Sequence, residues 1–254
     1  MTALAFTEAV QTAAQYLREA RSVVALTGAG LSTPSGIPDF RSAGSGLWTQ
    51  NDPMKVSSLT TFRQRPERFF NWLRPLAQQI LAAAPNAAHA AMAELEQAGR
   101  LKAVITQNID GLHQRAGSQN VIELHGSLRQ AHCVHCYQAY SLELYAPAFI
   151  DREQIPRCPA CGWVLKPDII LFEEALPIKA LEEAQALCES ADLILIAGTA
   201  LEVSPANRLP MFAMENGARM IINTLSATPL DMFADVLMPY DVAQALPAIA
   251  KEVL

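Results

Sequence analysis

The sequence lacks the features that mark several common classes of protein. No apolar run approaches the ~18 residues of a membrane-spanning helix, and the longest candidate, residues 193–197, has the length of a strand. No block of lysine or arginine stands out, and the formal net charge is −6, so a basic surface for a phosphate backbone is missing. No internal repeat or low-complexity segment is visible. We therefore expect neither membrane insertion nor nucleic-acid binding.

Cysteine is also scarce, and its spacing is informative. The chain has five cysteines, four of which form two Cys-x-x-Cys pairs. This arrangement suits a reducing compartment and a bound metal better than a disulfide scaffold. The first eight residues contain no basic segment of the kind that opens a secretory leader. We expect a cytoplasmic protein.

Apolar residues are plentiful and recur in short runs. They make up 51% of the 254 residues, which is enough for one large core with an insertion. Most of the expected strands are continuously apolar, as in strands covered on both faces: Val23–Leu26, Ala103–Ile105, Val121–Leu124, Leu193–Ala197, Met220–Ile222 and Val236–Met238. Helical patterns lie between them, at Thr7–Ala20, Asn86–Ala98, Ile178–Glu189, Pro205–Asn216 and Val242–Val253. The alternation predicts an α/β fold with a Rossmann-like, doubly wound parallel sheet.

Two segments interrupt this alternation. Ser42–Ala84 contains no expected strand, is rich in Trp and Phe, and has a helical pattern. Gly126–Lys166 carries the cysteine pairs and has little helical periodicity. We expect both to be insertions that form a smaller domain, with a helical module at 42–84 and a zinc-ribbon module at 126–166. The Rossmann-like domain is then discontinuous and comprises residues 1–41, 85–125 and 167–254.

Small or polar residues follow five of the expected strands, at the edge where open α/β sheets bind their ligands. These runs are Thr27–Ser32, Thr106–Gly111, His125–Ser127, Gly198–Ala200 and Asn223–Thr224. The turn at Gly28-Ala29-Gly30 would let the backbone approach a phosphate closely. However, Thr33 stands where a dinucleotide fingerprint has its third glycine, so a purely structural turn is an equal alternative.

A single histidine, His125, follows one of these strands and precedes the flexible Gly126. A side chain that ordinarily titrates near pH ~6.5 is suited to act as a general base. A structural histidine is the other interpretation, and the residues alone leave the two open.

The two cysteine pairs, Cys133-x-x-Cys136 and Cys158-x-x-Cys161, are separated by 21 residues. Four thiolates on two tight turns complete a tetrahedral zinc site and leave no open coordination position. We therefore predict one structural Zn²⁺ with no catalytic role. His132 and His135 lie nearby and are expected at the surface, while Cys188 is expected to be a small buried hydrophobe.

Together these motifs resemble those of a bacterial sirtuin. They occur in that family's order across roughly residues 20 to 245, which is nearly the whole chain. The matching segments are Gly28–Arg41 (GAGLSTPSGIPDFR), Thr106–His113 (TQNIDGLH), Leu124-His125-Gly126, the two cysteine pairs, and Gly198–Ala206 (GTALEVSPA).

The resemblance implies an NAD-dependent protein-lysine deacylase, with acetyl as the expected acyl group. Such an enzyme consumes NAD, acts on proteins or peptides that bear acyl-lysine, and yields nicotinamide, deacylated lysine and O-acyl-ADP-ribose. Matched position by position, His125 is the general base and Asn108 a second catalytic residue. The same matching assigns the NAD site in the Rossmann-like domain to Gly28, Ala29, Gly30, Ser32, Ile37, Asp39, Phe40, Arg41, Gln107, Asn108, Ile109, Asp110, Gly198, Thr199, Ala200, Asn223, Thr224, Leu225 and Val242.

Roles within this set also follow from the resemblance. The glycine turn and the Gly198 turn would hold phosphates, while Asn108 and Asp110 would position the ribose and the nicotinamide amide. Ile37 would line the nicotinamide pocket, and Phe40, on a mobile cofactor loop, would shield the reacting face from water. Asn223 would hold the adenosine ribose.

The sequence departs from the family pattern at three places. Glu173 replaces the glycine of a Phe-Gly-Glu segment that pairs with substrate, so its charge lies beside the acyl-lysine tunnel or points to solvent. Ala200 replaces a common serine and removes one hydroxyl contact to the phosphates. Phe70 and Leu73 align with the Tyr-x-x-Arg pair of members that favour succinyl or malonyl groups, so we expect an apolar acyl pocket that disfavours those groups.

Two other functions are compatible with parts of the pattern. A protein mono-ADP-ribosyltransferase would also use NAD but would not need a base for the ribose hydroxyl. A non-enzymatic zinc-ribbon module for nucleic acid would need a basic stripe, which is missing. The sequence does not name the physiological substrate, and we expect a monomer.

Overall fold

The computed structural model describes residues 5–42, 44 and 46–254. Residues 1–4 of the expected Rossmann-like domain, and residues 43 and 45 of the expected helical module, lie outside the described residues. The helices are α1 (Phe6–Glu19), α2 (Leu47–Gln50), α3 (Pro53–Val56), α4 (Leu59–Gln64), α5 (Pro66–Ala82), α6 (Ala87–Gln97), α7 (Leu112–Ala116), α8 (Ala146–Ile150), α9 (Ile178–Glu189), α10 (Leu209–Glu215) and α11 (Val242–Val253). The strands are β1 (Val23–Thr27), β2 (Ala103–Thr106), β3 (Val121–Glu123), β4 (Gly126–Cys133), β5 (Ala139–Ser141), β6 (Leu165–Ile169), β7 (Leu193–Ala197), β8 (Arg219–Asn223) and β9 (Val236–Met238).

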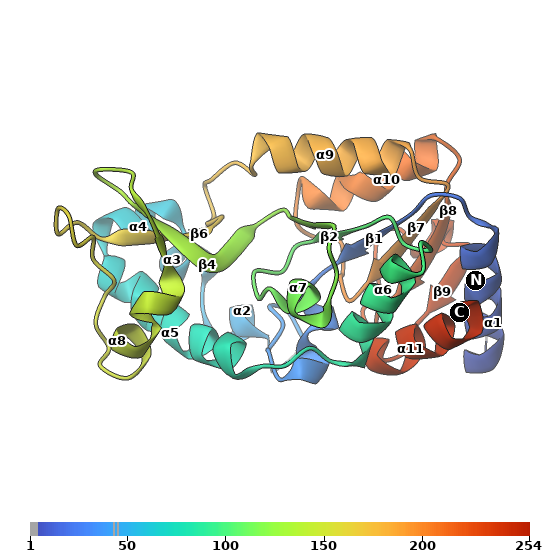
Figure 1. Cartoon of the computed structure of the whole chain (residues 1–254), viewed down its shortest axis with the longest axis horizontal. Coiled ribbons are helices and arrows are strands. Elements are labelled where there is room, and N and C mark those ends of the chain that lie inside the picture. Colours follow the sequence, from blue (N-terminus) through green and yellow to red (C-terminus); the bar gives the residue numbers. More distant parts are fainter. Residues whose placement is uncertain (1–4, 43, 45) are drawn as a thin grey trace.

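A six-stranded parallel sheet with helices packed around it forms the larger part of the molecule (Figure 1). Its order is β3-β2-β1-β7-β8-β9, so the chain runs outward from β1 in one direction and then returns to continue in the other. This is the order of the doubly wound dinucleotide-binding fold. All six strands predicted from the apolar runs are present, and the predicted fold class is confirmed.

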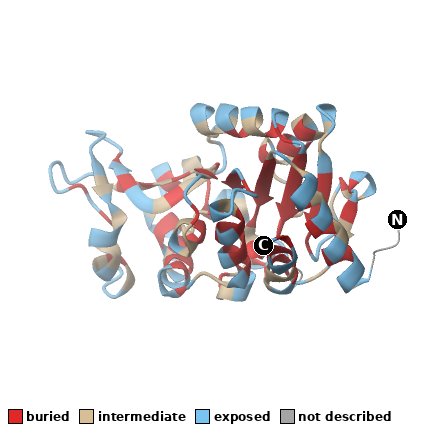
Figure 2. Cartoon of the chain, turned by 45° about the vertical axis from the view of Figure 1, so that its right-hand side comes forward, coloured by how far each residue is buried: buried red, intermediate tan, exposed pale blue. Residues whose placement is uncertain are grey.

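Alternate residues of each central strand face opposite layers of helices. Val23 and Ala25 of β1 pack with α1, α6 and α11, while Val24 and Leu26 pack with α9 and α10. Because both faces are covered, β1 and β7 are buried along their whole length. Figure 2 shows the buried strands between helices whose outer faces are exposed. The continuous apolar runs of the sequence follow from this double coverage.

The second part of the molecule combines the two insertions (Figure 1). Helices α2 to α5 form the helical module, and β5-β4-β6 form a small antiparallel sheet that carries the cysteine turns. Phe62, Phe69 and Phe70 make edge-to-face contacts within the helical module, and Phe70 contacts Phe149 of α8 in the same way. This apolar cluster joins the two modules. In the described part of the chain, no helix has both the length and the apolar character needed to cross a bilayer.

Candidate active site

The residues after the strands meet where the strand order reverses, between β1 and β7. Backbone hydrogen bonds connect consecutive turns: Gly30 N donates to Gly198 O at 2.8 Å, and Gln107 N donates to Thr27 O at 3.0 Å. Gly198 N in turn donates to Asn223 O at 3.0 Å. Ligands of doubly wound sheets bind outside the carboxyl ends of the strands at this reversal. Four of the five predicted runs are therefore joined directly at the expected crevice.

The glycines of the first turn are required by close packing. A Cβ on Gly28 would lie 2.7 Å from Thr199 Cβ, and one on Gly30 would lie 2.9 Å from Gly198 O. Gly28 therefore lies against the side chain of Thr199 and Gly30 against the backbone of Gly198, which is a sufficient structural reason for the glycines. Gly198 itself has φ of +62°, and a Cβ there would lie 2.2 Å from Leu31 N. The phosphate-binding role of these turns stays a prediction.

His125 lies between β3 and β4, with its ring fixed by one hydrogen bond. Its Nδ1 is 2.9 Å from Gln107 O, which can only accept, so Nδ1 carries the proton. In the neutral ring Nε2 is then an unprotonated acceptor. Burial lowers the pKa of His125 below its ordinary value, and the hydrogen bond to Gln107 partly opposes this shift. The neutral form with a basic Nε2 is the one that a general base requires.

A polar network lies beside this turn. Asn108 is 8% exposed, and its Nδ2 donates to Gly28 O at 3.0 Å and to Ser32 Oγ at 3.1 Å. Ser32 Oγ donates to Asp110 Oδ2 at 2.7 Å, and the other carboxylate oxygen accepts from Leu112 N at 2.9 Å. The side chains predicted to hold the ribose and the nicotinamide amide are thus brought together and fixed in orientation.

The predicted cofactor loop is tied to both parts of the molecule. The ring of Phe40 stacks on Trp48 with centroids 5.1 Å apart, and Trp48 stacks on Trp72 of α5 at 5.6 Å. Arg41 Nε lies 2.9 Å from Glu202 Oε2 in the loop after β7. The aromatic contacts place the predicted water shield against the helical module.

Other predicted residues of this loop and its surroundings are also placed. Asp39 accepts hydrogen bonds from the backbone of Arg41 and Ser42 at 3.0 and 2.7 Å, which fixes the start of the loop. Ile37 is buried in the apolar cluster that joins the two insertions, and the partly buried Ile109 packs against the same cluster.

The residues predicted at the adenosine end lie after β7 and β8. Asn223 Nδ2 donates to Met238 O at 2.9 Å, whereas its buried Oδ1 has no hydrogen-bond partner among the described residues. An unpartnered buried acceptor at a strand end suits the hydroxyl group of a ligand. Leu225 is 74% exposed, and Val242 begins α11 with its side chain in the core. Their assignment to the cofactor stays a prediction, as does that of the half-buried Ala200 and the buried Thr224.

The four predicted zinc ligands converge. All four sulfur atoms lie within 4.8 Å of one another, with Sγ separations of 3.3 Å for Cys133 and Cys161 and 3.6 Å for Cys136 and Cys158. Tetrahedral zinc with Zn–S bonds of about 2.3 Å needs sulfur atoms about 3.8 Å apart, so the cluster fits one Zn²⁺. Cys188 is buried in α9, away from this cluster.

The two nearby histidines are exposed, as predicted, and each has a partner outside the cysteine cluster. His132 Nδ1 lies 2.6 Å from Asp168 Oδ1, and the ring of His135 stacks on Trp163. Neither belongs to the group of residues that could hold the metal.

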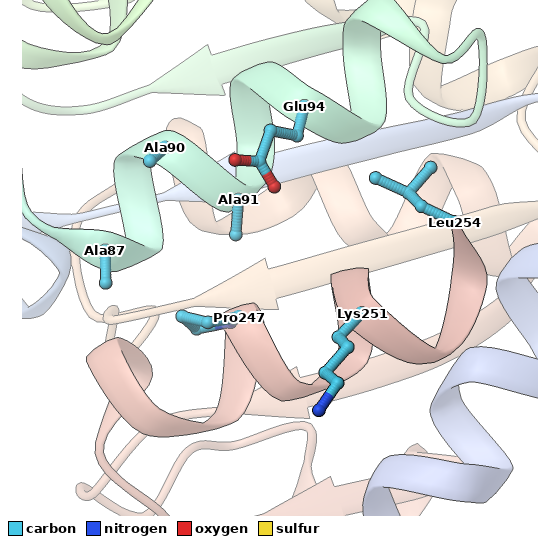
Figure 3. A pocket seen from close by; sticks show the side chains of 7 residues that line it. All are labelled: Ala87, Ala90, Ala91, Glu94, Pro247, Lys251 and Leu254. Atoms are coloured by element: carbon cyan, nitrogen blue, oxygen red, sulfur yellow. The ribbon is translucent and has the colours of Figure 1, made fainter.

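A separate hollow of about 460 Å³ lies between α6 and α11 (Figure 3). Its wall is made of small or aliphatic side chains, with Glu94 and Lys251 as the charged groups. None of the predicted site residues lines it. It brings together no acid, base or nucleophile in an arrangement that suggests chemistry.

Comparison with known proteins identifies the family. The Sir2 family model matches residues 28–205, which is more than half of the chain. The chain belongs to the Sir2 family. The NAD-dependent protein deacetylase of Oceanobacillus iheyensis is 41% identical over 238 residues, covering 93% of this chain and 98% of that protein.

Solved Sir2 structures have the same fold along almost the whole chain. A structure described as the structural basis for the mechanism and regulation of Sir2 enzymes has a TM-score of 0.91 at 41% identity, and the match covers 97% of this chain and 98% of that one. A Sir2 variant with a deacetylated p53 peptide and 3′-O-acetyl-ADP-ribose has a TM-score of 0.90 at 38% identity, with 96% and 98% coverage. The resemblance to a sirtuin is therefore confirmed.

Two parts of the site were not assigned from the Sir2 motifs. Trp48 connects Phe40 to Trp72 of the helical module. In the sequence, its position in an aromatic-rich insertion is the feature that could have indicated this role. His113 closes the TQNIDGLH motif, and its Nε2 lies 3.0 Å from Thr27 Oγ1 beneath the crevice. A histidine in a specific motif suggests a role, but the sequence does not show which strand it contacts.

Proposed function

We propose that this chain is an NAD-dependent protein-lysine deacylase whose general base is His125. The observation that carries the proposal is the fixed ring of His125, with Nδ1–H on Gln107 O and Nε2 available at the carboxyl edge of the sheet. The name of the relative from Oceanobacillus iheyensis and the product complex of the Sir2 variant support the same reaction class.

Bound NAD would supply the ADP-ribose group that accepts the acyl group, with nicotinamide as the leaving group. The glycine turns after β1 and β7 would approach the phosphates with bare backbone. Asn108 and Asp110 would orient the nicotinamide ribose, because their side chains are already fixed by Ser32. Phe40, held by the Trp48 stack, would exclude water while the glycosidic bond is broken. Once the acyl oxygen has replaced nicotinamide on the ribose, His125 Nε2 would take the proton of the ribose hydroxyl that attacks the acyl carbon. Departure of the lysine amine and addition of one water would then give O-acyl-ADP-ribose.

The acyl group that fits this chain is small or aliphatic. Phe70 and Leu73, which align with the acid-recognising pair of other family members, are each 1% exposed within an apolar cluster. A succinyl carboxylate there would lose its hydration without gaining a cation. We expect acetyl to be removed faster than succinyl from the same peptide; the reverse order would contradict this assignment.

The protein substrates would meet the enzyme in a reducing compartment, since the cysteine cluster binds zinc as thiolates and would lose it if the cysteines were oxidised to disulfides. We propose the cytoplasm as its location and a monomer as its working form. The absence of a basic stripe supports a protein partner over nucleic acid.

The decisive experiment is product analysis with an acetyl-lysine peptide and labelled NAD. The wild type should release deacetylated peptide and O-acetyl-ADP-ribose only when NAD is present. His125→Ala should form neither, yet should keep exchange of labelled nicotinamide into NAD, because the base is needed after the glycosidic bond has broken. Thermal melting of both proteins checks that the variant is folded.

Two results would overturn the proposal. Deacetylation without NAD would exclude the mechanism, and an undiminished rate in His125→Ala would exclude the base. Label that remained attached to protein would indicate ADP-ribosyl transfer instead.

A further inference from the structure

A groove outside the candidate active site runs between the helical module and the zinc ribbon. Its volume is about 720 Å³, within the range of binding sites of about 300–1,000 Å³. One wall comes from α4 and the start of α5, and the other from β4, β6 and the two cysteine turns. None of the residues predicted to bind NAD or act as base lines this groove.

Aromatic side chains are unusually exposed on the zinc-ribbon wall. Trp163 is 54% exposed, with its ring stacked on His135 at a centroid distance of 5.1 Å, and Tyr137 is 78% exposed. Tyr137 also has a φ of +60°, so its backbone is held in the left-handed region. Buried Phe62 of α4 lines the opposite wall. Exposed Trp and Tyr beside a groove are typical of a surface that binds another chain.

The groove is also positively charged within an acidic protein. Arg63, Arg157 and Lys166 line it, and Glu174 is its one acidic lining residue. Glu174 is already engaged, because its Oε2 lies 2.9 Å from Lys166 Nζ and accepts from Leu171 N at 2.9 Å. The acid therefore does not neutralise the two arginines.

Both arginines retain free donors. Arg157 Nη1 donates to Gly162 O at 3.2 Å, and its other guanidinium donors are unused among the described residues. The side chain of Arg63 makes no hydrogen bond or ion pair within the described part of the chain. Glu173 lies close enough for Arg63 to act on it electrostatically, but Thr60 N already holds its carboxylate at 2.8 Å. A guanidinium with unused donors is suited to bind a carboxylate in two-point fashion.

The groove is continuous with the segment that leads to the active site. Lys166 Nζ donates to Ile169 O at 2.8 Å, and Phe172 follows three residues later. Phe172 N donates to Ser57 O and its carbonyl accepts from Leu59 N, while its ring contacts Trp48 of α2. One end of the groove is thus attached to the segment that contacts Trp48, on which Phe40 of the cofactor loop stacks.

We propose that this groove binds an acidic segment of the protein substrate, outside the acyl-lysine itself. This inference rests on the proposed function for the identity of the ligand, because it assumes that one substrate polypeptide occupies both the groove and the active site. The arginines would bind carboxylates of the segment, and Trp163 and Tyr137 would pack on its apolar side chains. Proteins with an acidic stretch near the modified lysine would therefore be preferred substrates.

The test compares three acetyl-lysine peptides: a short one, the same peptide with an acidic and aromatic extension, and the same peptide with an extension in which serine replaces each acid. Extensions are placed on either side of the lysine. With the wild type, the acidic extension on one side should lower KM about three- to tenfold relative to serine at unchanged kcat, as expected for exposed charge pairs. This gain should shrink at high salt.

Charge-reversal variants assign the effect to the groove. The double variant R63E/R157E should lose the gain from the acidic extension and keep its kcat and KM for the short peptide. Arg68→Glu is the matched control, because Arg68 is an exposed arginine of α5 that does not line the groove, and it should keep the gain. Equal KM values for the acidic and serine extensions, or a gain that persists in R63E/R157E, would overturn the proposal.

A binding measurement separates this inference from the proposed reaction. Fluorescence anisotropy of the labelled acidic segment, without acetyl-lysine or NAD, should show weak binding to the wild type and none to R63E/R157E. That result would stand even if no deacylation were found. Tighter binding of a single-stranded oligonucleotide than of the acidic segment would refute the choice of ligand.

Discussion

Lowering the pH should weaken the fold, because two histidines are buried beneath the crevice without an anionic hydrogen-bond partner. His89 of α6 and His113 of α7 are 0% and 1% exposed, with ring centroids 5.0 Å apart. His89 Nδ1 accepts from Asn86 N at 3.3 Å, and its Nε2 has no partner among the described residues. His113 Nε2 contacts the Thr27 hydroxyl, and its Nδ1 has no partner within the same residues. A proton added to either ring would place a charge in the core.

Burial lowers the pKa of His89 to about 4, with partial opposition from the charge of Asp110, and lowers the pKa of His113 to about 3. In the unfolded chain both side chains return to about 6.5. Because the folded values are depressed, the unfolded chain binds more protons below pH ~6.5, so the free energy of unfolding falls as the pH falls. At pH ~5.5 each histidine accounts for a loss of about 1.4 kcal/mol, and the pair for about 3 kcal/mol. The loss continues until the pH reaches the folded values.

Urea unfolding from about pH 7.5 to about pH 5.5 measures this loss, with zinc content checked at each pH so that metal release is not mistaken for it. His89→Gln and His113→Gln should each remove about 1.4 kcal/mol of the loss, and what remains includes the contribution of the partly buried His125. Assigned NMR signals of the two rings should not titrate across this range in the folded protein. Rings that titrate near pH ~6.5, or an unchanged free energy of unfolding at pH ~5.5, would refute the reasoning.

Three further predictions concern the base, the substrate segment and the metal. Gly126→Ala should lower the free energy of unfolding in urea by at least about 2 kcal/mol, because φ is +71° and the new Cβ would lie 1.9 Å from Asp168 O. An unchanged free energy of unfolding would contradict this. Glu173→Gly should be more stable than Glu173→Ala by about 1 kcal/mol. Both variants lose the hydrogen bond from Thr60 N, and only glycine relieves the backbone strain at a φ of +75°. Equal stabilities would exclude backbone strain at this position. Chelation should remove one zinc per chain, unfold the ribbon by circular dichroism and abolish turnover, whereas Cys188→Ser should keep its zinc; full turnover without metal would exclude a bracing role.

The large sheet was predictable because its strands are covered on both faces. Leu193–Ala197 and Val236–Met238 were predicted with the bounds that the structure shows. β1 extends one residue beyond the apolar run, to Thr27, because the hydroxyl of this buried residue is paired with Thr106 Oγ1 at 2.9 Å. A polar residue ends an apolar pattern even where a tertiary partner lets the strand continue.

A proline and the shortness of some helices limited the prediction of helices from the sequence. The pattern at Pro205–Asn216 predicted one helix, but the structure has a 3₁₀ turn at Ala206–Arg208 followed by α10. Pro210 has no N–H to donate to the Ala206 carbonyl, so the α-helix starts beside it. The short helices α7 and α8 have only five residues each, too few to show a helical period in the sequence.

The sequence predicts which residues belong to the site better than it predicts which residues each of them contacts. The spacing within the two Cys-x-x-Cys pairs identified the zinc ligands, because tetrahedral coordination of one Zn²⁺ requires ligands on two tight turns. The sequence does not decide whether Glu173 lies beside the acyl-lysine tunnel or points to solvent. In the structure its carboxylate accepts a hydrogen bond from Thr60 N, at the start of α4. That bond joins residues 113 apart in sequence, and no local pattern encodes it. His89 and His113 were likewise unassigned, since their roles depend on burial in the assembled core.

The cofactor loop links the two parts of the molecule through contacts of unequal strength. Phe40, Trp48 and Trp72 form two successive ring stacks toward the helical module, each worth about 0.5–1.5 kcal/mol beyond the apolar area that it buries. Arg41 and Glu202 form the ion pair toward the sheet, with side chains 40% and 55% exposed, and such pairs contribute at most about 1 kcal/mol. The loop is therefore held mainly by the helical module and should move with it when the two parts approach each other. Under the proposed function, closure of the smaller domain on a substrate peptide would then carry Phe40 over the nicotinamide pocket, so that water is excluded only when both substrates are bound.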